Sequence, residues 1–404
     1  MFTKEITSYL ARINLNLCVN RGHEDDILMG MEQYLKLENA IDRFSTPSDN
    51  KSDLKLESFS ARGNNKTVIV PLISDKRLNF HGDVELGTPG QKFRVVFDTG
   101  SSDFWVPSVH CTSLPCMLHK RFDPKLSPTF VDLNNRFTIS YGTGEMIGKL
   151  ANDRLKIGDV ELHNQDFGVS IHEGPFFGKM NFDGVFGLGY PGISKSQGKQ
   201  PFYRMVKDGE IDSPKFSFWI DRVVEHGKQC AEVVLGGVNP ERFTGPITYA
   251  PTHDKRYWRL PLADIKLGNK SIFINANLGI VDTGTTLVVL PARDSETINK
   301  YIGAGEFNER LGVYSIDCDP RNRKTVTFSL GGVKLNIKPE NYIFKLASGR
   351  CVSAFSSSQN SGDVFFVLLW KRTGNSVNRD MRAILIGKDM GSRPGVFEGV
   401  AYHI

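Results

Sequence analysis

Two Asp-Thr-Gly tripeptides in matching contexts are the residues of this chain best suited to do chemistry. Asp98 follows the apolar run RVVF, Asp282 follows LGIV, and hydroxyl residues come after each tripeptide. A single copy is typical of a polar turn that an aspartate opens. Chance would give a second matching tripeptide in only about a tenth of chains at ordinary residue usage. Two copies in the same context therefore favour a functional pair.

Two carboxylates brought within hydrogen-bonding distance do not both ionise readily. One keeps a proton while the other is charged, so the pair titrates as a unit. The charged carboxylate can take a proton from a water molecule, while the protonated one polarises a substrate carbonyl. We therefore predict that Asp98 and Asp282 hydrolyse an amide bond with no metal, no cofactor and no covalent intermediate.

The elements that must hold these carboxylates are predicted to be short β-strands. From about residue 67 the chain is a succession of short apolar or alternating runs separated by Gly, Pro and Asn, and the pattern recurs after about residue 240. Such spacing is typical of an all-β protein. The runs include TVIVPLI, KFRVVFD and LKIGDVEL in the first part and WRLPLADIKLG and TLVVLP in the second.

Length and repetition predict the division into units. A chain of 404 residues is long enough for two or three domains. We predict a prosegment and linker over residues 1–70, an N-terminal β lobe with Asp98 and the flap over 71–245, and a C-terminal β lobe with Asp282 over 246–404.

Charge and hydropathy exclude two classes of partner. The formal net charge is only +5, and Lys and Arg are scattered, so we expect no nucleic acid partner. A membrane-spanning helix needs about 20 consecutive apolar residues. The longest run here, VFFVLLW at 364–370, is interpreted as a buried strand, and no membrane span is predicted.

Four stretches of the sequence resemble motifs of the pepsin-like aspartic proteases, the family of cathepsin D, renin and the plasmepsins. They are FDTGSSDFWVPS (97–108) and VDTGTTLVVLP (281–291) for the two active-site loops, ISYGTGEMIGKL (139–150) for the flap hairpin, and FDGVFGLGYP (182–191) for the stretch behind the first loop. The resemblance covers roughly residues 75–387. It implies an all-β, bilobal fold of two β-barrel-like lobes with the active-site cleft between them.

The resemblance also implies roles for residues around the dyad of Asp98 and Asp282. Four hydroxyl residues match the positions that support the dyad: Thr99 and Thr283, which lock the two loops together, and Ser101 and Thr285, which bond the outer carboxylate oxygens.

A flap that covers the substrate is implied in the same way. Tyr141 matches the flap tyrosine and Trp105 its hydrogen-bonding partner, although both could be ordinary core aromatics. Phe177 and Phe182 could line an apolar subsite, and core packing is an equal alternative. The flap tip is expected at Gly142, Thr143 and Gly144.

The cysteines divide into two pairs and two single residues. Cys111 and Cys116 have a spacing compatible with a small disulfide loop, and nothing later in the chain completes a metal site with them. The resemblance implies the pairings Cys111–Cys116 and Cys318–Cys351, while Cys18 and Cys230 stay single. Two bridges favour an oxidising compartment, although the first residues show no signal-peptide pattern. We expect the secretory pathway, with an acidic vesicle, vacuole or lysosome-like destination, or secretion.

The two ends of the chain raise separate expectations. Residues 1–70 stand where the family carries an inhibitory prosegment, and Arg62, Lys66 or Lys76 could lie across the carboxylates at neutral pH, or could simply be solvated. Near the C-terminus, AILIGKDM (383–390) resembles the apolar-Gly-Asp motif that closes the second lobe, but Lys388 stands where Asp is expected. Asp389 could take its place. We expect this segment to lie beneath the second catalytic loop, where the lysine could alter the titration of the dyad.

The sequence thus predicts an aspartic endopeptidase, made as a zymogen, that favours bulky apolar residues at acidic pH. The expected partners are protein or peptide substrates and pepstatin-like inhibitors, and the expected state is a monomer. The alternative is a catalytically silent peptide-binding homologue with an altered C-terminal segment. A β-rich structural protein is a more distant alternative.

Overall fold

The computed structural model describes residues 66–73, 80–141, 144–220, 229–242, 247–309, 311–346, 348–358, 362–367, 383–388 and 398–402. Several predictions made from the sequence lie outside these residues. They concern the segment 1–65, and with it Cys18 and Arg62, and also Lys76, Gly142, Thr143 and Asp389.

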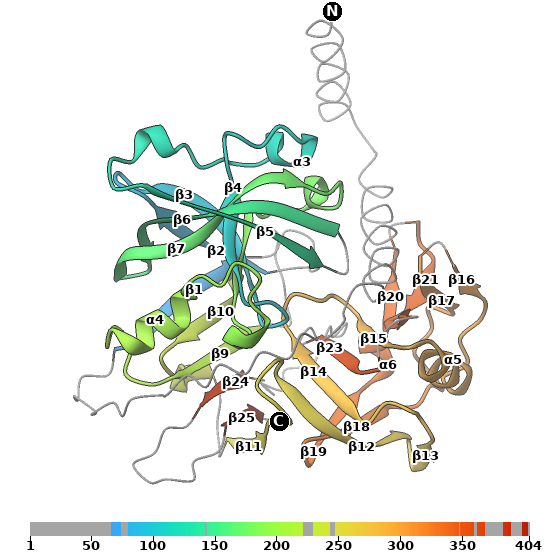
Figure 1. The fold of residues 1–404 in the computed structure, drawn as a ribbon. Coiled ribbons are helices and arrows are strands. Elements are labelled where there is room, and N and C mark those ends of the chain that lie inside the picture. Colours follow the sequence, from blue (N-terminus) through green and yellow to red (C-terminus); the bar gives the residue numbers. More distant parts are fainter. Residues whose placement is uncertain are drawn as a thin grey trace, which may run out of the picture.

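The strands among the described residues form three sheets, which Figure 1 shows as a group around β1–β10 and a second group around β12–β23. The largest sheet has thirteen strands in the order β11-β25-β24-β9-β10-β1-β2-β3-β8-β4-β7-β6-β5. Its strands are β1 (Val68–Ile73), β2 (His81–Leu86), β3 (Gln91–Asp98), β4 (Phe104–Pro107), β5 (Val131–Tyr141), β6 (Gly144–Ile157), β7 (Val160–Glu173), β8 (Gly184–Gly187), β9 (Lys215–Ile220), β10 (Gln229–Leu235), β11 (Thr248–Pro251), β24 (Ala383–Lys388) and β25 (Glu398–Tyr402).

The second sheet has eight strands, with seven in the order β19-β18-β12-β14-β23-β15-β22 and β13 paired to β12. Its strands are β12 (Arg259–Leu267), β13 (Lys270–Ile272), β14 (Leu278–Asp282), β15 (Val288–Pro291), β18 (Val326–Leu330), β19 (Val333–Ile337), β22 (Phe355–Ser358) and β23 (Val364–Val367). A four-stranded sheet lies beyond it, with β16 (Phe307–Asn308), β17 (Val313–Ile316), β21 (Cys351–Ser353) and β20 (Ile343–Lys345).

Helices are short in the part of the chain that the structure describes. The α-helices are α3 (Leu114–Met117), α4 (Pro201–Lys207), α5 (Ala292–Tyr301) and α6 (Pro339–Tyr342), and the 3-10 helices are η2 (Pro124–Leu126), η3 (Phe177–Lys179), η4 (Pro191–Ile193) and η5 (Pro240–Arg242). No helix within those residues is both long and apolar enough to cross a membrane.

The burial of the strands follows from their patterns. β1 alternates buried and exposed residues because only one of its faces is covered. β8 is buried at all four positions, as expected of a strand in the middle of a sheet with both faces covered. The run LKIGDVEL spans the turn between β6 and β7, where Gly158 has a φ of 54°, so this run is a hairpin and not one strand.

The same three-strand arrangement occurs in both groups of strands. In the first, β3 lies parallel to β8, and β8 also pairs with β4; in the second, β14 lies parallel to β23, and β23 also pairs with β15. In both groups the predicted catalytic aspartate is the last residue of the parallel strand, β3 or β14. The run VFFVLLW was predicted to be a buried strand, and its first four residues form β23.

One prediction about the C-terminal segment is wrong. Residues 383–388, with Lys388, do not lie beside β14 under the second catalytic loop. They form β24, which pairs with β9 and β25 in the thirteen-stranded sheet. β14 lies between β12 and the parallel strand β23, and the four residues of β23 include no glycine, so an apolar run that ends in glycine does not identify this strand.

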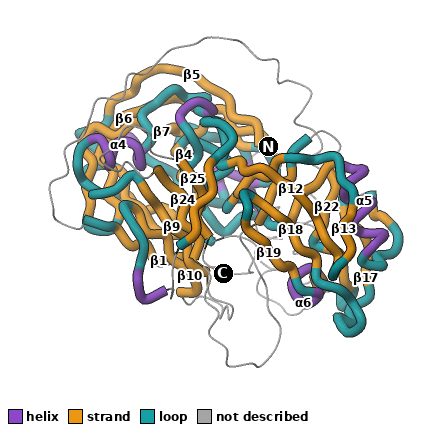
Figure 2. Tube along the Cα trace, turned by 90° about the horizontal axis from the view of Figure 1, so that it is seen from below, coloured by secondary structure: helices purple, strands orange, loops and turns teal. Residues whose placement is uncertain are grey.

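Strand pairing connects the two halves of the chain. β11, β24 and β25 all come after residue 245, yet they extend the sheet that holds Asp98. β24 pairs with β9, β25 pairs with β24, and β11 pairs with β25; Figure 2 shows β24 and β25 beside β9. The domain boundary predicted between residues 245 and 246 stays a prediction. The thirteen-stranded sheet contains strands from both sides of that boundary.

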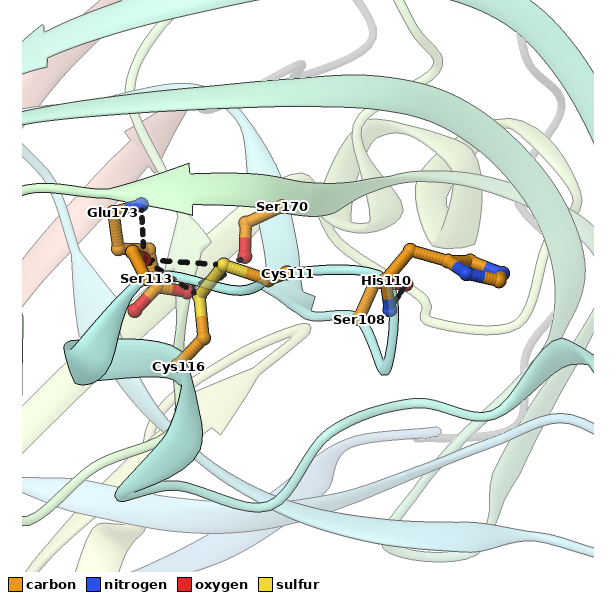
Figure 3. The surroundings of a disulfide bond; sticks show 7 residues. All are labelled: Ser108, His110, Cys111, Ser113, Cys116, Ser170 and Glu173. Carbon is orange, nitrogen blue, oxygen red and sulfur yellow. Dashed lines mark hydrogen bonds between the residues drawn. A yellow bond between two sulfur atoms is a disulfide. The ribbon is translucent and has the colours of Figure 1, made fainter. Parts of the chain in front are cut away.

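Both predicted disulfides are present. Cys111 is joined to Cys116 beside the N-terminus of α3, and Ser113 lies against both sulfur atoms (Figure 3). Cys318 is joined to Cys351 on β21.

Candidate active site

Asp98 and Asp282 lie at the carboxyl ends of two strands in the middle of their sheets. The two residues are buried, with 7% and 9% of their surface exposed. The three residues before each aspartate, 95–97 and 279–281, are apolar and buried, so the chain presents a carboxylate where a buried strand end passes into a loop. This placement brings together the two residues that the sequence singled out.

A reciprocal set of hydrogen bonds ties the two loops to each other. The Thr99 N–H donates to Thr283 Oγ1 and the Thr283 N–H to Thr99 Oγ1, each at 2.9 Å. The Thr99 hydroxyl donates to the Val281 carbonyl at 2.8 Å, and the Thr283 hydroxyl to the Phe97 carbonyl at 2.6 Å. Each hydroxyl therefore both accepts and donates across the boundary between the two loops.

The two glycines of the tripeptides allow the carboxylates to approach. A Cβ placed on Gly100 would lie 2.6 Å from Asp282 Cγ, and one placed on Gly284 would lie 2.7 Å from Asp98 Cγ. Neither distance leaves room for a side chain. Each tripeptide thus needs glycine because the aspartate of the other tripeptide occupies that space.

Asp98 accepts hydrogen bonds on both carboxylate oxygens. The Gly100 N–H donates to Oδ1 at 2.8 Å, and the Ser101 hydroxyl donates to Oδ2. Burial raises the pKa of the Asp98 carboxyl above its usual range, and the bonds from Ser101, Gly100 and Asp282 offset this only in part. A carboxyl that keeps its proton more readily than usual is what a proton-sharing pair requires.

Asp282 has an equivalent backbone contact. The Gly284 N–H donates to its Oδ1 at 2.8 Å, which matches the Gly100 contact at Asp98. Thr285, two residues beyond Thr283, is buried. The hydrogen bond expected between its hydroxyl and Asp282 stays a prediction.

The hydrogen bond expected between Trp105 and Tyr141 is present, while the role of Tyr141 in a flap stays a prediction. The Trp105 Nε1–H donates to Tyr141 Oη at 2.7 Å, and the Trp105 ring is fully buried. Phe177 packs edge-on against both rings, with centroid distances of 5.2 Å to Trp105 and 5.8 Å to Tyr141. Phe182 belongs to the same buried cluster. The predicted tip residue Gly144 pairs with Tyr141 in the β5–β6 hairpin.

The Tyr141 hydroxyl lies in the electrostatic field of Asp98. Burial raises the pKa of the Tyr141 hydroxyl well above its usual value, the bond from Trp105 lowers it in part, and the negative charges of Asp98 and Asp103 raise it further. The Tyr141 hydroxyl thus stays neutral and keeps a proton that it can donate in a hydrogen bond.

Sequence reasoning missed Tyr257 and Trp258, which precede β12. Burial raises the pKa of the Tyr257 hydroxyl, and the charges of Asp282 and Asp98 raise it further, which places this phenol in the electrostatic field of both carboxylates. Trp258 donates its Nε1–H to the Leu188 carbonyl at 2.9 Å. The only signal in the sequence is an aromatic pair within the polar stretch DKRYWRL, which is equally typical of core packing.

Asp103 was also missed, although it lies inside the first motif. It is buried, and its carboxylate accepts hydrogen bonds from the Ser194 hydroxyl, the Lys195 N–H and both the N–H and the hydroxyl of Ser196, at 2.6–3.0 Å. These four bonds fix the loop after Asp98 to the segment around residue 195. Across the described residues, no cluster of three or more His, Cys, Asp or Glu side chains is placed to hold a metal ion.

Comparison with known proteins agrees with this geometry. The family model described as eukaryotic aspartyl protease matches residues 79–369. The chain belongs to the eukaryotic aspartyl protease family.

Individual relatives share about a third of their residues with this protease. Vacuolar protease A of Neurospora crassa is 37% identical over 312 residues, which cover 77% of this chain and 76% of the relative. Cathepsin E-A of Xenopus laevis is 36% identical over 288 residues, covering 70% and 72%. The vacuolar aspartic protease of Candida albicans is 33% identical over 355 residues, covering 87% and 80%.

These matches confirm the predicted resemblance, the all-β bilobal fold and the assignment as an aspartic-type endopeptidase. They do not favour the alternative of a catalytically silent homologue. The matched region ends at residue 369, so it contains β23 and ends before β24. The predicted extent, to residue 387, goes 18 residues beyond the end of this match.

Proposed function

We propose that this protease cleaves peptide bonds with a water molecule activated between Asp98 and Asp282. The observation that carries the proposal is the reciprocal pairing of the two loops through Thr99 and Thr283, which holds two buried carboxylates against each other. The raised pKa of Asp98 supports a pair that keeps one proton in weakly acidic solution.

The reaction follows from that protonation state. The ionised carboxylate takes a proton from the water while the water oxygen bonds to the peptide carbonyl carbon. The protonated carboxyl gives its proton to the carbonyl oxygen. The tetrahedral intermediate then breaks its C–N bond as the leaving nitrogen receives the proton taken from water. At the same time the carboxylate that gave up its proton takes one back from a hydroxyl of the intermediate, which becomes the carbonyl of the acid product. The dyad returns to one proton shared by two carboxylates, so atoms and charge balance over the cycle. Ser101 and Thr285 orient the outer oxygens in this proposal.

In this proposal the flap and its apolar neighbours determine the substrate specificity. Tyr141, held by Trp105, closes over an extended peptide together with the tip at residues 142–144 and excludes water from the dyad. Phe177 packs on both rings and offers an apolar wall, so bulky apolar side chains are the expected specificity. Pepstatin-like inhibitors fit the same extended site, and the protease acts as a monomer.

Activation and location are further parts of the proposal. Relatives with names such as vacuolar protease A and cathepsin E-A support an acidic vacuolar, lysosome-like or secreted location. Two disulfides agree with a secretory route. The segment before residue 71 acts as an inhibitory prosegment that acid releases.

The test is acid-dependent cleavage of denatured globin by the full chain, with and without pepstatin, from about pH 3 to about pH 7. Asp98→Asn and Asp282→Asn should each lower kcat by about a thousandfold or more, because each removes a proton-transfer group. Asp83→Asn, which changes an exposed aspartate on β2, is the matched control and should keep full activity. Folded protein without pepstatin-sensitive cleavage at any of these pH values would refute the proposal.

A further inference from the structure

A hairpin of the eight-stranded sheet carries a motif that the catalytic proposal does not use. Residues 269–271 read Asn-Lys-Ser, an Asn-x-Ser/Thr sequence, which accepts N-linked oligosaccharides in secreted proteins. The same motif begins at Asn50 and at Asn65, which lie outside the described residues. Asn269 is thus the acceptor whose surroundings the structure shows.

Asn269 lies in a tight turn between β12 and β13. Leu267 pairs with Lys270, so Gly268 and Asn269 alone connect the two strands. Gly268 has a φ of 59°, and a two-residue hairpin turn with glycine in first place requires such a positive value. The turn leaves Asn269 exposed at the tip of the hairpin.

The hydroxyl residue of the motif also points away from the molecule. Ser271 is exposed, whereas Ile272 is buried. The Lys270 ammonium lies 4.8 Å from the centre of the Tyr301 ring on α5. Because successive side chains of a strand point to opposite faces, Lys270 and Ile272 hold the hairpin against the molecule while Ser271 faces outward.

The outward side of the hairpin has room for a bulky group. Phe273, two residues beyond Ser271, is 85% exposed, the largest value among the exposed large apolar residues that the structure describes. No described part of the chain therefore covers this side. The Ser271 hydroxyl donates to Asp264 Oδ2 at 3.4 Å, a long and exposed bond that holds the hydroxyl only weakly.

The hairpin tip is distant from the dyad. β12 runs antiparallel to β14, and its first residue, Arg259, pairs with Ile280, two residues before Asp282. From there the nine residues of β12 lead away from the dyad, over roughly 25 Å at about 3.3 Å a residue. Figure 1 shows β13 at the outer edge of the second group of strands. A group attached at this turn therefore does not approach the two carboxylates.

We propose that Asn269 carries an N-linked oligosaccharide, taken from a donor in which the sugar is joined to a lipid diphosphate. The amide nitrogen of Asn269 bonds to the anomeric carbon of the first sugar, and the bond from that carbon to the diphosphate oxygen breaks. The nitrogen gives one proton to a base of the transferase, and the lipid diphosphate leaves, with no oxidation or reduction. This proposal rests on the secretory route of the proposed function, which the two disulfides support.

The first test uses the protein purified from its own cells. A peptide N-glycosidase in heavy-oxygen water converts a glycosylated asparagine to a labelled aspartate, and mass spectrometry of the proteolytic peptides locates the label. We expect the label at position 269 in most of the protein. Asparagine at position 269 that stays unlabelled throughout the sample would overturn the proposal.

Variants separate this acceptor from the two others. In the full chain with Asn50→Gln and Asn65→Gln, expressed in the same cells, the glycosidase should shift the gel mobility by one oligosaccharide. Asn269→Gln and Ser271→Ala should each abolish this shift, whereas Ser271→Thr keeps the hydroxyl and should retain it. Asn336→Gln changes an exposed asparagine outside such a motif and is the matched control, which should shift as its parent does. A shift that persists in Asn269→Gln would contradict the proposal.

The same samples distinguish failure of this proposal from failure of the proposed function. An unmodified Asn269 in protein that has the Cys111–Cys116 disulfide and cleaves globin in a pepstatin-sensitive way overturns the modification alone. An unmodified Asn269 together with reduced Cys111 and Cys116 overturns the secretory route as well. A modified Asn269 in folded protein without such cleavage overturns the catalytic proposal and supports the modification.

Discussion

Glu173, the last residue of β7, is a buried carboxyl that the catalytic proposal does not use. It is 1% exposed and lies beside the Cys111–Cys116 disulfide (Figure 3). Its Oε1 accepts a bond from the Ser170 hydroxyl at 2.7 Å, and its backbone N–H donates to Ser113 Oγ at 3.0 Å. Its Oε2 is buried and has no hydrogen-bond partner among the described residues.

Two charged groups lie close to this carboxyl. His119 Nδ1 is 3.7 Å from Asp183 Oδ1, and its Nε2–H donates to the Phe177 carbonyl at 2.8 Å. Burial raises the pKa of Asp183, but bonds from His119 and from the N–H groups of Arg94 and Lys120 lower it below its usual range. The anion of Asp183 and the cation of His119 thus form a pair, and Phe177 connects this pair to the flap contact.

The pKa of Glu173 is raised to about 7, first by burial and then by the charge of Asp183, against the bond from Ser170 and the charge of His119. The folded pKa exceeds the unfolded value of 4.5, so Glu173 contributes stability fully below pH 4.5 and loses it as pH rises through about 7. The size of this contribution is roughly 3 kcal/mol. Burial lowers the pKa of His119, but its bonds to Asp183 and Phe177 raise it above 6.5, which gives the same direction.

In wild type the melting temperature should fall between about pH 5 and about pH 8 as Glu173 loses its proton. Glu173→Gln should reduce this fall and extend activity toward neutral pH, because glutamine has no proton to lose. The slope due to His119 should remain. Melting temperature against pH is the measurement, with the exposed Glu241→Gln as the control that should follow wild type. A Glu173→Gln curve parallel to wild type across this range would contradict the prediction.

At the scale of elements, the loops at the ends of β3 and β14 depend on two hydroxyl groups. Thr99→Val keeps the shape of the side chain but removes the donor to the Val281 carbonyl and the acceptor of the Thr283 N–H. The unpaired buried groups should cost about 2–4 kcal/mol of unfolding free energy, and kcat should fall because the loops lose their mutual register. Thr99→Ser keeps the hydroxyl and is the control.

Urea denaturation and kcat measured on both Thr99 variants check this expectation. If Thr99→Ser loses as much stability and activity as Thr99→Val, the methyl group and its packing matter instead of the hydroxyl. If neither variant differs from wild type, the paired threonines do not hold the loops.

Most strands and the dyad were predictable because their signals are local. KFRVVFD and TLVVLP are apolar runs bounded by turn residues, and they form β3 and β15. Asp98 and Asp282 were found because each lies in a repeated tripeptide. The run LKIGDVEL was divided by Gly158, whose positive φ makes the β6–β7 turn.

The sequence did not indicate which strands and side chains far apart in the chain lie against each other. An apolar run shows that a strand is buried but does not say which strand it pairs with, so 383–388 was placed beside β14 where 364–367 belongs. Trp258 and Glu173 were missed for the same reason. Their roles come from contacts with Leu188, Ser170 and His119, and no spacing within one sequence indicates such contacts.

At the scale of the whole molecule, the two halves of the chain are joined by more than the paired threonines. The Leu188 N–H donates to the Asp98 carbonyl at 2.7 Å, and the Leu188 carbonyl accepts the Trp258 Nε1–H at 2.9 Å. The Trp258 carbonyl in turn accepts the Val281 N–H at 3.0 Å. A continuous chain of hydrogen bonds therefore runs from Asp98 to the residue before Asp282.

Trp258→Phe removes one bond from that chain while keeping an aromatic ring to stack on Tyr190, whose centroid lies 4.3 Å away. The Leu188 carbonyl is left buried without its donor, which should cost about 1–3 kcal/mol of unfolding free energy. The Leu188 N–H also bonds the Asp98 carbonyl, so kcat should fall even where Trp258→Phe is fully folded, while KM changes little.

Trp219→Phe on β9, whose ring lies 3.8 Å from the Arg242 guanidinium, makes the same exchange away from this chain of bonds. It should lower stability while kcat stays at the wild-type value, and equal effects of the two variants on kcat would show that Trp258 serves packing alone.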